Sequence, residues 1–150
     1  MAEYHLAQIN IARMLAPIDD LIMAEFVAQL APVNALADSS PGFVWRLQTE
    51  SGDATSLKVY DDDMIIINMT VWESVESLRE FVYKNAHHAV LRERKRWFEK
   101  FDGSYYALWW LPAGHIPGTQ EAKERLDHLR EHGETEYAFS FQHIFPKPAE

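Results

Sequence analysis

The chain has 150 residues, no cysteine, and 23 acidic against 14 basic residues, which gives a formal net charge of −9. The length suits one domain over residues 1–150, and the lack of cysteine excludes disulfides, thiolate nucleophiles and cysteine-ligated zinc. Hydrophobic residues make up 47% of the chain, which excludes intrinsic disorder, and the acidic balance argues against a nucleic-acid partner.

The first predicted elements are a strand and a helix. Apolar and polar residues alternate over residues 4–14, which is the pattern of a strand. An acidic turn after Pro17 opens the helix, whose apolar stripe runs as far as Val33, and Pro32 is expected to kink or shorten it. The polar residues 38–42 are expected to form a loop.

The middle of the chain is expected to hold two strands and a long helix. Residues 43–48 form a short strand, and a polar, turn-rich segment with a hairpin near 51–53 follows it. Residues 64–72 are apolar almost throughout, so both faces of this strand are expected to be covered. The helix is expected at 75–100.

The last predicted elements are a strand at 105–111, a helix at 119–132 and a strand at 138–145. Thr119 is the expected N-cap of that helix, and Gly133 is expected to end it. The whole order predicts an α+β protein of the ferredoxin-like βαββαβ type with a C-terminal helix and strand.

Two helices cover only one face of such a sheet. The other face is therefore expected to meet a second sheet, most simply that of an identical chain, which predicts a homodimer. No stretch approaches the ~20 apolar residues of a membrane span, so no membrane partner is expected. The N-terminus lacks the basic residues of a signal peptide, so the cytoplasm is the expected location.

Three segments carry a resemblance to a known family: FVYKNAH at 81–87, RKRWF at 94–98 and LWWLPAGH at 108–115. They resemble a bacterial family catalogued as a domain of unknown function, number 3291, and the similarity runs over nearly the whole chain. That family belongs to the dimeric α+β barrel superfamily, which includes antibiotic-biosynthesis monooxygenases, haem-degrading enzymes and small-molecule isomerases. The resemblance implies this fold and a homodimer, but no particular reaction, because one fold hosts many chemistries.

Asn68, Trp72 and Arg92 form the candidate catalytic set. Asn68 and Trp72 are four residues apart in a predicted strand and so share a face, and Arg92 follows on the predicted long helix. Quinone-forming monooxygenases of the superfamily, which this arrangement resembles, carry an Asn, a Trp four residues later and an Arg on the next helix. They oxidise an electron-rich phenol with dioxygen and use no metal or flavin.

The resemblance implies a role for each of these three residues. Trp72 would be the wall of the site, Asn68 the donor to the oxyanion, and Arg92 the cation that favours the phenolate. The tyrosine that those enzymes place shortly after the Trp is replaced here by Leu78. The plainer interpretation is that Trp72 belongs to the core, Asn68 bonds backbone and Arg92 makes a surface ion pair.

His87 shares a stripe of the predicted long helix with Tyr83. A neutral histidine there would serve as a general base near pH 7, or it would simply hydrogen-bond a neighbour. Haem-degrading relatives place a His on this helix, an Asn on the first strand and a Trp on the third strand. His87, Asn10 and Trp72 would match them, so haem is the alternative to the expected absence of a cofactor.

Further aromatic and loop residues complete the expected substrate-binding set, which is Asn10, Trp45, Tyr83, Trp109 and His115. His115 follows a Pro-Ala-Gly turn, where a histidine either faces a site or bridges loops. No metal site is expected, because the two histidines of the HxxEH match at 128–132 fall away from the apolar stripe of their helix.

The residues together predict a protein with a pocket for a small aromatic or otherwise hydrophobic molecule. If it is catalytic, a cofactor-independent monooxygenase acting on an aromatic or polycyclic phenol is expected. The alternatives from other classes are a non-catalytic ligand-binding or interaction module and a haem-binding protein.

Overall fold

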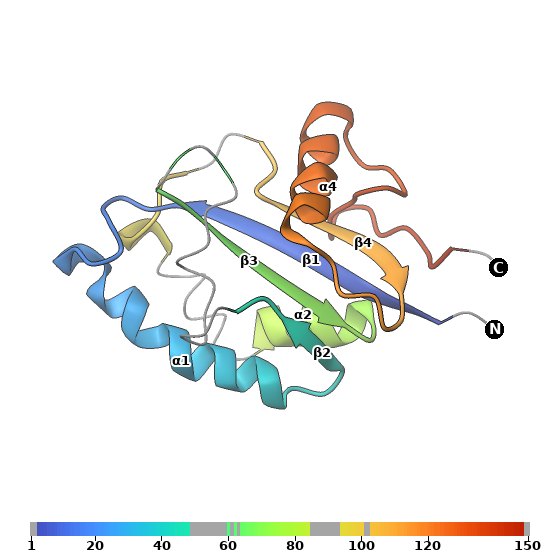
Figure 1. Ribbon diagram of the computed structural model, residues 1–150, viewed down its shortest axis with the longest axis horizontal. Helices are drawn as coiled ribbons and strands as arrows, with labels where there is room; N and C mark the ends of the chain where they lie inside the picture. The colour runs from blue at the N-terminus through green and yellow to red at the C-terminus, as the bar shows by residue number, and fades with distance from the viewer. Residues whose placement is uncertain are drawn as a thin grey trace.

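The computed structural model describes residues 3–48, 60, 62, 64–84, 94–100 and 103–148. The strands and helices in these parts are β1 (Tyr4–Arg13), α1 (Ala24–Ser39), β2 (Phe43–Arg46), β3 (Ile65–Trp72), α2 (Val75–Lys84), β4 (Tyr106–Pro112) and α4 (Thr119–His132). Short 3-10 helices lie at Leu21–Met23 and Arg94–Arg96. Figure 1 shows the strands as one sheet with α1 and α2 on one side and α4 on the other.

The four strands form an antiparallel sheet in the order β2-β3-β1-β4. The N-terminal strand is therefore central: Leu6 pairs with Trp72 on β3 and with Trp110 on β4. This strand order, with helices after the first and third strands, is the ferredoxin-like plan. The predicted α+β class and βαββαβ order are confirmed.

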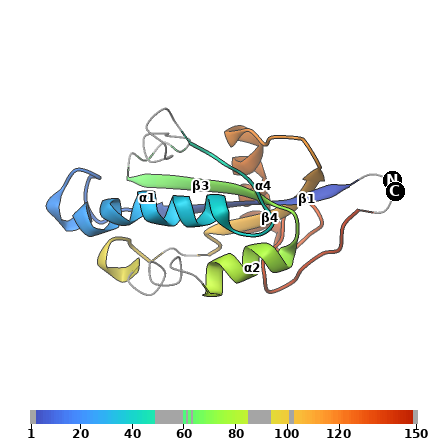
Figure 2. The same cartoon turned by 90° about the horizontal axis from the view of Figure 1, so that it is seen from below.

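Each face of the sheet carries helices of the same chain. On one face, α4 packs Ala122, Leu126 and Leu129 onto buried residues that include Ile9 and Trp109. Figure 2 shows α1 and α2 in front of the other face. The homodimer was predicted from an uncovered second face. Helix α4 packs over the β1 and β4 part of that face, whereas Trp45 of β2 and Ile65 of β3 stay partly exposed there, so the homodimer stays a prediction.

The α1/α2 face carries two separate apolar clusters. The cluster beside α2 is centred on Trp72 and includes Leu6, Leu78, Phe81, Leu108 and Phe139. The cluster at the start of α1 joins Met23, Phe26, Ile66, Trp97 and Phe98. Apolar burial at about 25 cal/mol per Å² makes these clusters the main stabilisation of this face.

The predicted helix at 75–100 is wrong in its last part, and residues 85–93 lie outside the described chain. Arg94–Arg96 is a 3-10 helix, and Phe98 forms a β-bridge with Met14. The backbone explains the difference, because the N–H of Leu15 donates to the Trp97 carbonyl at 2.8 Å and the N–H of Glu99 donates to the Arg13 carbonyl at 2.8 Å. An α-helix cannot offer its backbone groups to a neighbouring strand in this way.

The predicted strand at 138–145 is also wrong, because only Phe139 forms a bridge, with Leu108 of β4. The next residue turns the chain: the hydroxyl and the backbone N–H of Ser140 both donate to the Glu134 carboxylate. A side-chain acceptor thus takes the place of a strand partner.

The ends of the helices differ from the predictions in two places. The N-cap of α4 is Gly118 and not Thr119, whereas Gly133 does end the helix, at φ +78°. Helix α1 continues past Pro32 to Ser39, so the proline does not shorten it. Pro32 lies on the exposed side of the helix, where its ring meets little of the protein.

One described helical stretch, Leu21–Ser39, is long and apolar enough to cross a membrane by length and composition alone, with a mean hydropathy of 1.2. This stretch is therefore one candidate against the expectation that no part of the chain is long and apolar enough to span a membrane. A core helix of a soluble protein that passes this test is mostly buried, whereas 17% of this window is buried, at residues that include Phe26 and Ala37.

Gly42, between α1 and β2, is closely packed against α2. Its φ is +83°, and a Cβ added there would lie 2.5 Å from both the Cβ and the Oγ of Ser77. We expect Gly42→Ala to lower the free energy of unfolding by about 2–4 kcal/mol, from the left-handed backbone and the overpacking together. Urea denaturation measures this loss.

Gly103→Ala is the matched control for this substitution. Gly103 has nearly the same φ, +82°, but no atom of the described residues lies within 4 Å of the position of its added Cβ. Gly103→Ala should therefore lower the free energy of unfolding only by the cost of the left-handed backbone, about 1–2 kcal/mol. Equal losses for the two variants would contradict the contact with Ser77.

Candidate functional site

Polar side chains occupy the middle of the α1/α2 face, between its two apolar clusters. The register places Asn10 of β1 opposite Asn68 of β3 and opposite Tyr106 of β4. In the next layer of the same face, Gln8 lies opposite Thr70. We call these five residues the polar row. Buried polar groups are costly unless they are hydrogen-bonded, so their partners decide what this row can do.

A chain of hydrogen bonds orients part of the row. The Asn10 Nδ2 donates to the Gln8 Oε1 at 3.1 Å, and the Gln8 Nε2 donates to the Thr70 Oγ1 at 3.0 Å. The Trp72 Nε1 donates to the same Thr70 oxygen at 2.8 Å. Gln8, Thr70 and Trp72 are all buried. Because a hydroxyl oxygen has two lone pairs, Thr70 can accept both bonds, and Trp72 thereby helps to orient Asn10.

Asn68 is the member of the row with unused hydrogen-bonding capacity. Its side chain is partly exposed and makes no hydrogen bond with any other residue in the described part of the chain. An amide carries two N–H donors and a carbonyl acceptor. Donors that are fixed on a strand and directed at a ligand oxygen can stabilise negative charge on that oxygen.

Tyr106 ends the row on β4. Its hydroxyl oxygen accepts the backbone N–H of Phe141 at 3.1 Å. Burial raises the pKa of Tyr106, so the phenol keeps its proton at neutral pH and remains a donor. The Phe141 ring lies 5.9 Å from the Tyr106 ring and 6.1 Å from the ring of Tyr83, which is 51% exposed. These rings form an aromatic border beside the row.

Trp72 lies on the same face but is enclosed by other side chains. Its relative exposure is 0%, with the Phe43 ring at 5.5 Å and the Phe81 ring at 5.2 Å. It therefore contacts the polar row through its Nε1 and presents no exposed ring surface. In this structure Trp72 can influence Asn10 and Asn68 only by positioning their neighbours.

The other residues predicted for the site divide into two groups. Trp45 and Trp109 pack on the opposite face, in the cluster under α4, and so lie away from Asn10 and Asn68. Tyr83 is on α2, on the side of the polar row. His87 and Arg92 lie outside the described residues.

Glu121 connects two of the predicted residues, and sequence reasoning missed it. The His115 Nε2 lies 2.9 Å from the Glu121 Oε1, and the Trp109 Nε1 donates to the Glu121 Oε2 at 3.2 Å. His115 thus bridges its loop to the first turn of α4. The sequence feature that could have identified Glu121 is a carboxylate six residues after a loop histidine. Many surface loops have this spacing, so it does not single out a site.

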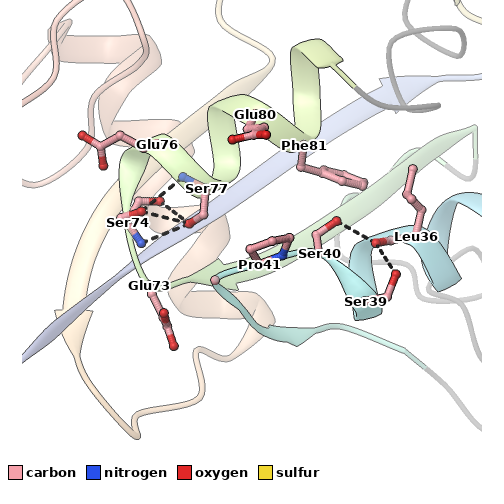
Figure 3. A pocket seen from close by; sticks show the side chains of 11 residues that line it. Leu36, Ser39, Ser40, Pro41, Glu73, Ser74, Glu76, Ser77, Glu80 and Phe81 are labelled. Carbon is pink, nitrogen blue, oxygen red and sulfur yellow. Dashed lines mark hydrogen bonds between the residues drawn. The ribbon is translucent and has the colours of Figure 1, made fainter.

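A groove of about 470 Å³ opens between the C-terminal end of α1 and the first turns of α2 (Figure 3). Its floor is formed by Phe81 and Leu36, and Ser40 and Ser77 lie on its two sides. None of the polar row lines this groove, but Phe81 also contacts Trp72. The described residues contain no group of three or more His, Asp or Glu that could hold a metal ion.

Comparisons with known proteins give one family. The model of a family described as "Domain of unknown function (DUF3291)" matches residues 5–150. No curated protein is significantly similar to the chain in sequence.

Three solved structures illustrate the similarity in fold. A protein of unknown function from Nitrosomonas europaea, NE2512, is 12% identical with a TM-score of 0.49, over 79% of this chain and 99% of that one. SnoaB, a cofactor-independent oxygenase from Streptomyces nogalater, is 18% identical with a TM-score of 0.48, over 75% and 95%. A putative antibiotic biosynthesis monooxygenase from Chloroflexus aurantiacus is 17% identical with a TM-score of 0.42, over 76% and 97%. At these values the structures carry no argument about the site.

Proposed function

The chain belongs to the DUF3291 family, and we propose that this member binds a small aromatic or polycyclic phenol over the polar row and oxidises it with dioxygen, without metal or flavin. The observation that carries the proposal is the polar row itself. At its centre lies Asn68, which is partly exposed and whose side-chain amide has no hydrogen-bond partner among the described residues. Asn10 lies beside it and is oriented by its hydrogen bond to Gln8.

A sheet face that serves only for packing does not need these residues. Apolar side chains of similar volume would join the two clusters of this face without the cost of burying Gln8 and Thr70. Polar groups kept at such a position indicate a use for their hydrogen bonds. The exposed part of the row and its aromatic border suit a flat molecule that carries a hydroxyl group.

The chemistry proposed for the site is a four-electron oxidation of the substrate. A phenol of the anthrone type loses a proton, and its anion reacts with dioxygen to form a hydroperoxide. Loss of water then leaves a quinone, so the methylene carbon becomes a carbonyl, with one oxygen atom in the quinone and the other in water. Asn68 would donate to the oxyanion, and the protonated Tyr106 would add a second donor.

The remaining parts of the proposal concern two residues that lie outside the described chain, the role of Trp72, the cofactor and the cellular location. We assign the cation that favours the phenolate to Arg92 and the general base to His87, and Trp72 acts through Thr70. The site uses no cofactor, and the protein acts in the cytoplasm.

A homodimer is also part of the proposal, although α4 covers the β1 and β4 part of the face that was expected to pair. Light scattering after size-exclusion chromatography tests this state. A mass near the 17.4 kDa of one chain would contradict the homodimer, and twice that mass would support it.

The reaction is tested with 1,8-dihydroxyanthrone in an oxygen electrode. We expect the protein, treated with a chelator, to consume one dioxygen per quinone formed and to place one labelled oxygen atom in the quinone when ¹⁸O₂ is supplied. A rate no higher than in buffer would contradict the oxygenase.

A binding measurement separates the alternatives from other classes. The product itself, 1,8-dihydroxyanthraquinone, should shift the side-chain amide NMR signals of Asn10 and Asn68. Binding without turnover would leave a non-catalytic ligand-binding protein. A Soret band after addition of haem would point instead to a haem protein.

A further inference from the structure

We propose that Glu134 is a positioning residue of the site, which directs the hydroxyl group of Tyr106 towards a ligand on the polar row. The proposal rests on the proposed function, in which Tyr106 donates to the substrate. Glu134 follows the C-terminal end of α4 and lies outside the polar row. Its link to Tyr106 consists of successive contacts through Ser140 and Phe141.

The first contact is a pair of hydrogen bonds from Ser140 to Glu134. The backbone N–H of Ser140 donates to the Glu134 Oε1 at 3.2 Å, and the Ser140 hydroxyl donates to the same oxygen. The Ser140 Oγ in turn accepts the backbone N–H of Gln142 at 3.1 Å. Because Ser140 is buried, these bonds are shielded from water and fix both its backbone and its side chain.

The residue before Ser140 is held by the edge strand of the sheet. The Leu108 N–H donates to the Phe139 carbonyl at 2.7 Å, and the Phe139 N–H donates to the Leu108 carbonyl at 2.9 Å. Phe139 is also fully buried. With Phe139 fixed by β4 and Ser140 fixed by Glu134, the direction of the next backbone N–H, that of Phe141, is determined.

The N–H of Phe141 carries the effect to Tyr106, to whose hydroxyl oxygen it donates at 3.1 Å. A phenol has a single proton, and a hydrogen bond accepted by its oxygen restricts the directions in which the O–H can point. Tyr106 and Leu108 are two residues apart on β4 and share a face of the sheet. The same strand therefore sets both ends of the connection.

The use of a carboxylate here indicates more than the holding of a turn. The second oxygen of Glu134, Oε2, is buried and has no hydrogen-bond partner among the described residues. A buried acceptor in this state is unfavourable for folding. What a carboxylate adds is strength, because hydrogen bonds to an ionised acceptor are about twice as strong as bonds between neutral groups. Strong restraint is useful where one donor must be placed accurately for a reaction.

The first test needs no substrate and measures the hydrogen exchange of the Phe141 amide by NMR. In Glu134→Leu the Phe141 N–H should lose its fixed direction towards Tyr106, and its exchange should become at least about tenfold faster. The amide of Leu108 is the internal control, because its bond to Phe139 does not involve Glu134. Its exchange rate should stay the same.

The second test asks whether Glu134 acts through Tyr106. Glu134→Leu should lower kcat for 1,8-dihydroxyanthrone by about 10–100-fold with little change in KM, as expected for a misplaced donor. Tyr106→Phe should lower kcat by about 10²-fold. The double variant should match Tyr106→Phe within about twofold, because without the hydroxyl group Glu134 has nothing to position.

Three further variants separate positioning from a general effect on the fold. Glu134→Gln keeps an acceptor for Ser140 and should restore kcat to within about threefold of the original protein. Ser140→Ala removes only the hydroxyl and should lower kcat by about 3–10-fold, which keeps the test available if Glu134→Leu does not fold. Glu136→Leu makes the same change at an exposed position of the same loop and should leave kcat unchanged.

Additive losses in the double variant would overturn the proposal, because Glu134 would then act on something other than Tyr106. An unchanged exchange rate at Phe141 would overturn it as well. Failure of the proposed function gives a different result, which is no consumption of dioxygen by the original protein. The exchange experiment would then still decide whether Glu134 holds the Phe141 N–H on Tyr106.

Discussion

Asn68→Ala is expected to lower kcat for 1,8-dihydroxyanthrone by about 10²–10³-fold while KM changes little. Loss of one preorganised donor to a developing oxyanion has an effect of this size. The donor acts on charge that is larger in the transition state than in the bound substrate, so the loss appears in kcat. Initial rates from the oxygen electrode over a range of substrate concentrations separate the two constants.

The same substitution should have little effect on stability. The Asn68 side chain is partly exposed and has no hydrogen-bond partner in the described chain, so its removal should change the free energy of unfolding by at most about 0.5 kcal/mol. Gln120→Ala, which removes an amide from α4 on the opposite face, should leave kcat unchanged. An unchanged kcat in Asn68→Ala would remove Asn68 from the reaction.

Thr70→Val is expected to lower the free energy of unfolding by about 2–4 kcal/mol. The side chain keeps its shape, but the Gln8 Nε2 and the Trp72 Nε1 both lose their acceptor in a buried environment. Each unsatisfied buried donor costs about 1–3 kcal/mol. Urea denaturation followed by tryptophan fluorescence measures the loss, and the emission of Trp72 should change as well.

Thr70→Ser is the control for this prediction, because it keeps the oxygen and removes only a methyl group. Thr70→Ser should lower the free energy of unfolding by about 1 kcal/mol. If valine and serine at this position lowered stability equally, the shared hydroxyl would not be what holds Gln8 and Trp72. In that case the proposed influence of Trp72 on Asn10 would also be wrong.

The four strands of the sheet were predicted well because their signals are local. The alternation in β1 and the apolar run in β3 need no knowledge of their partners. The errors occur where a distant contact overrides a local pattern. Trp97 and Phe98 continue the apolar spacing of a helix, but their backbone pairs with the end of β1.

The position of α4 could not be predicted from its own residues. Ala122, Leu126 and Leu129 show that one side of this helix is buried, and they do not show against what. The sequence prediction assigned the open face of the sheet to a second chain, whereas α4 of the same chain packs over the β1 and β4 part of it. An amphipathic pattern indicates burial but does not identify the partner.

Part of the candidate site could be predicted, because residues two or four apart on a strand share a face. This placed Asn68 with Trp72 on one face, and the structure adds Asn10 opposite Asn68. Gln8 and Thr70 were missed because their meeting depends on the register between β1 and β3, which no local pattern gives. Register also decided that Trp109 belongs to the other face.

The central place of β1 has a consequence for how the chain folds during synthesis. Leu6 leaves the ribosome before its neighbours Trp72 and Trp110, which come much later in the chain. Until then β1 has two unpaired edges and an apolar surface that nascent-chain partners such as chaperones can bind. Closing such long loops costs entropy before any pairing repays it, so this sheet must form late and slowly.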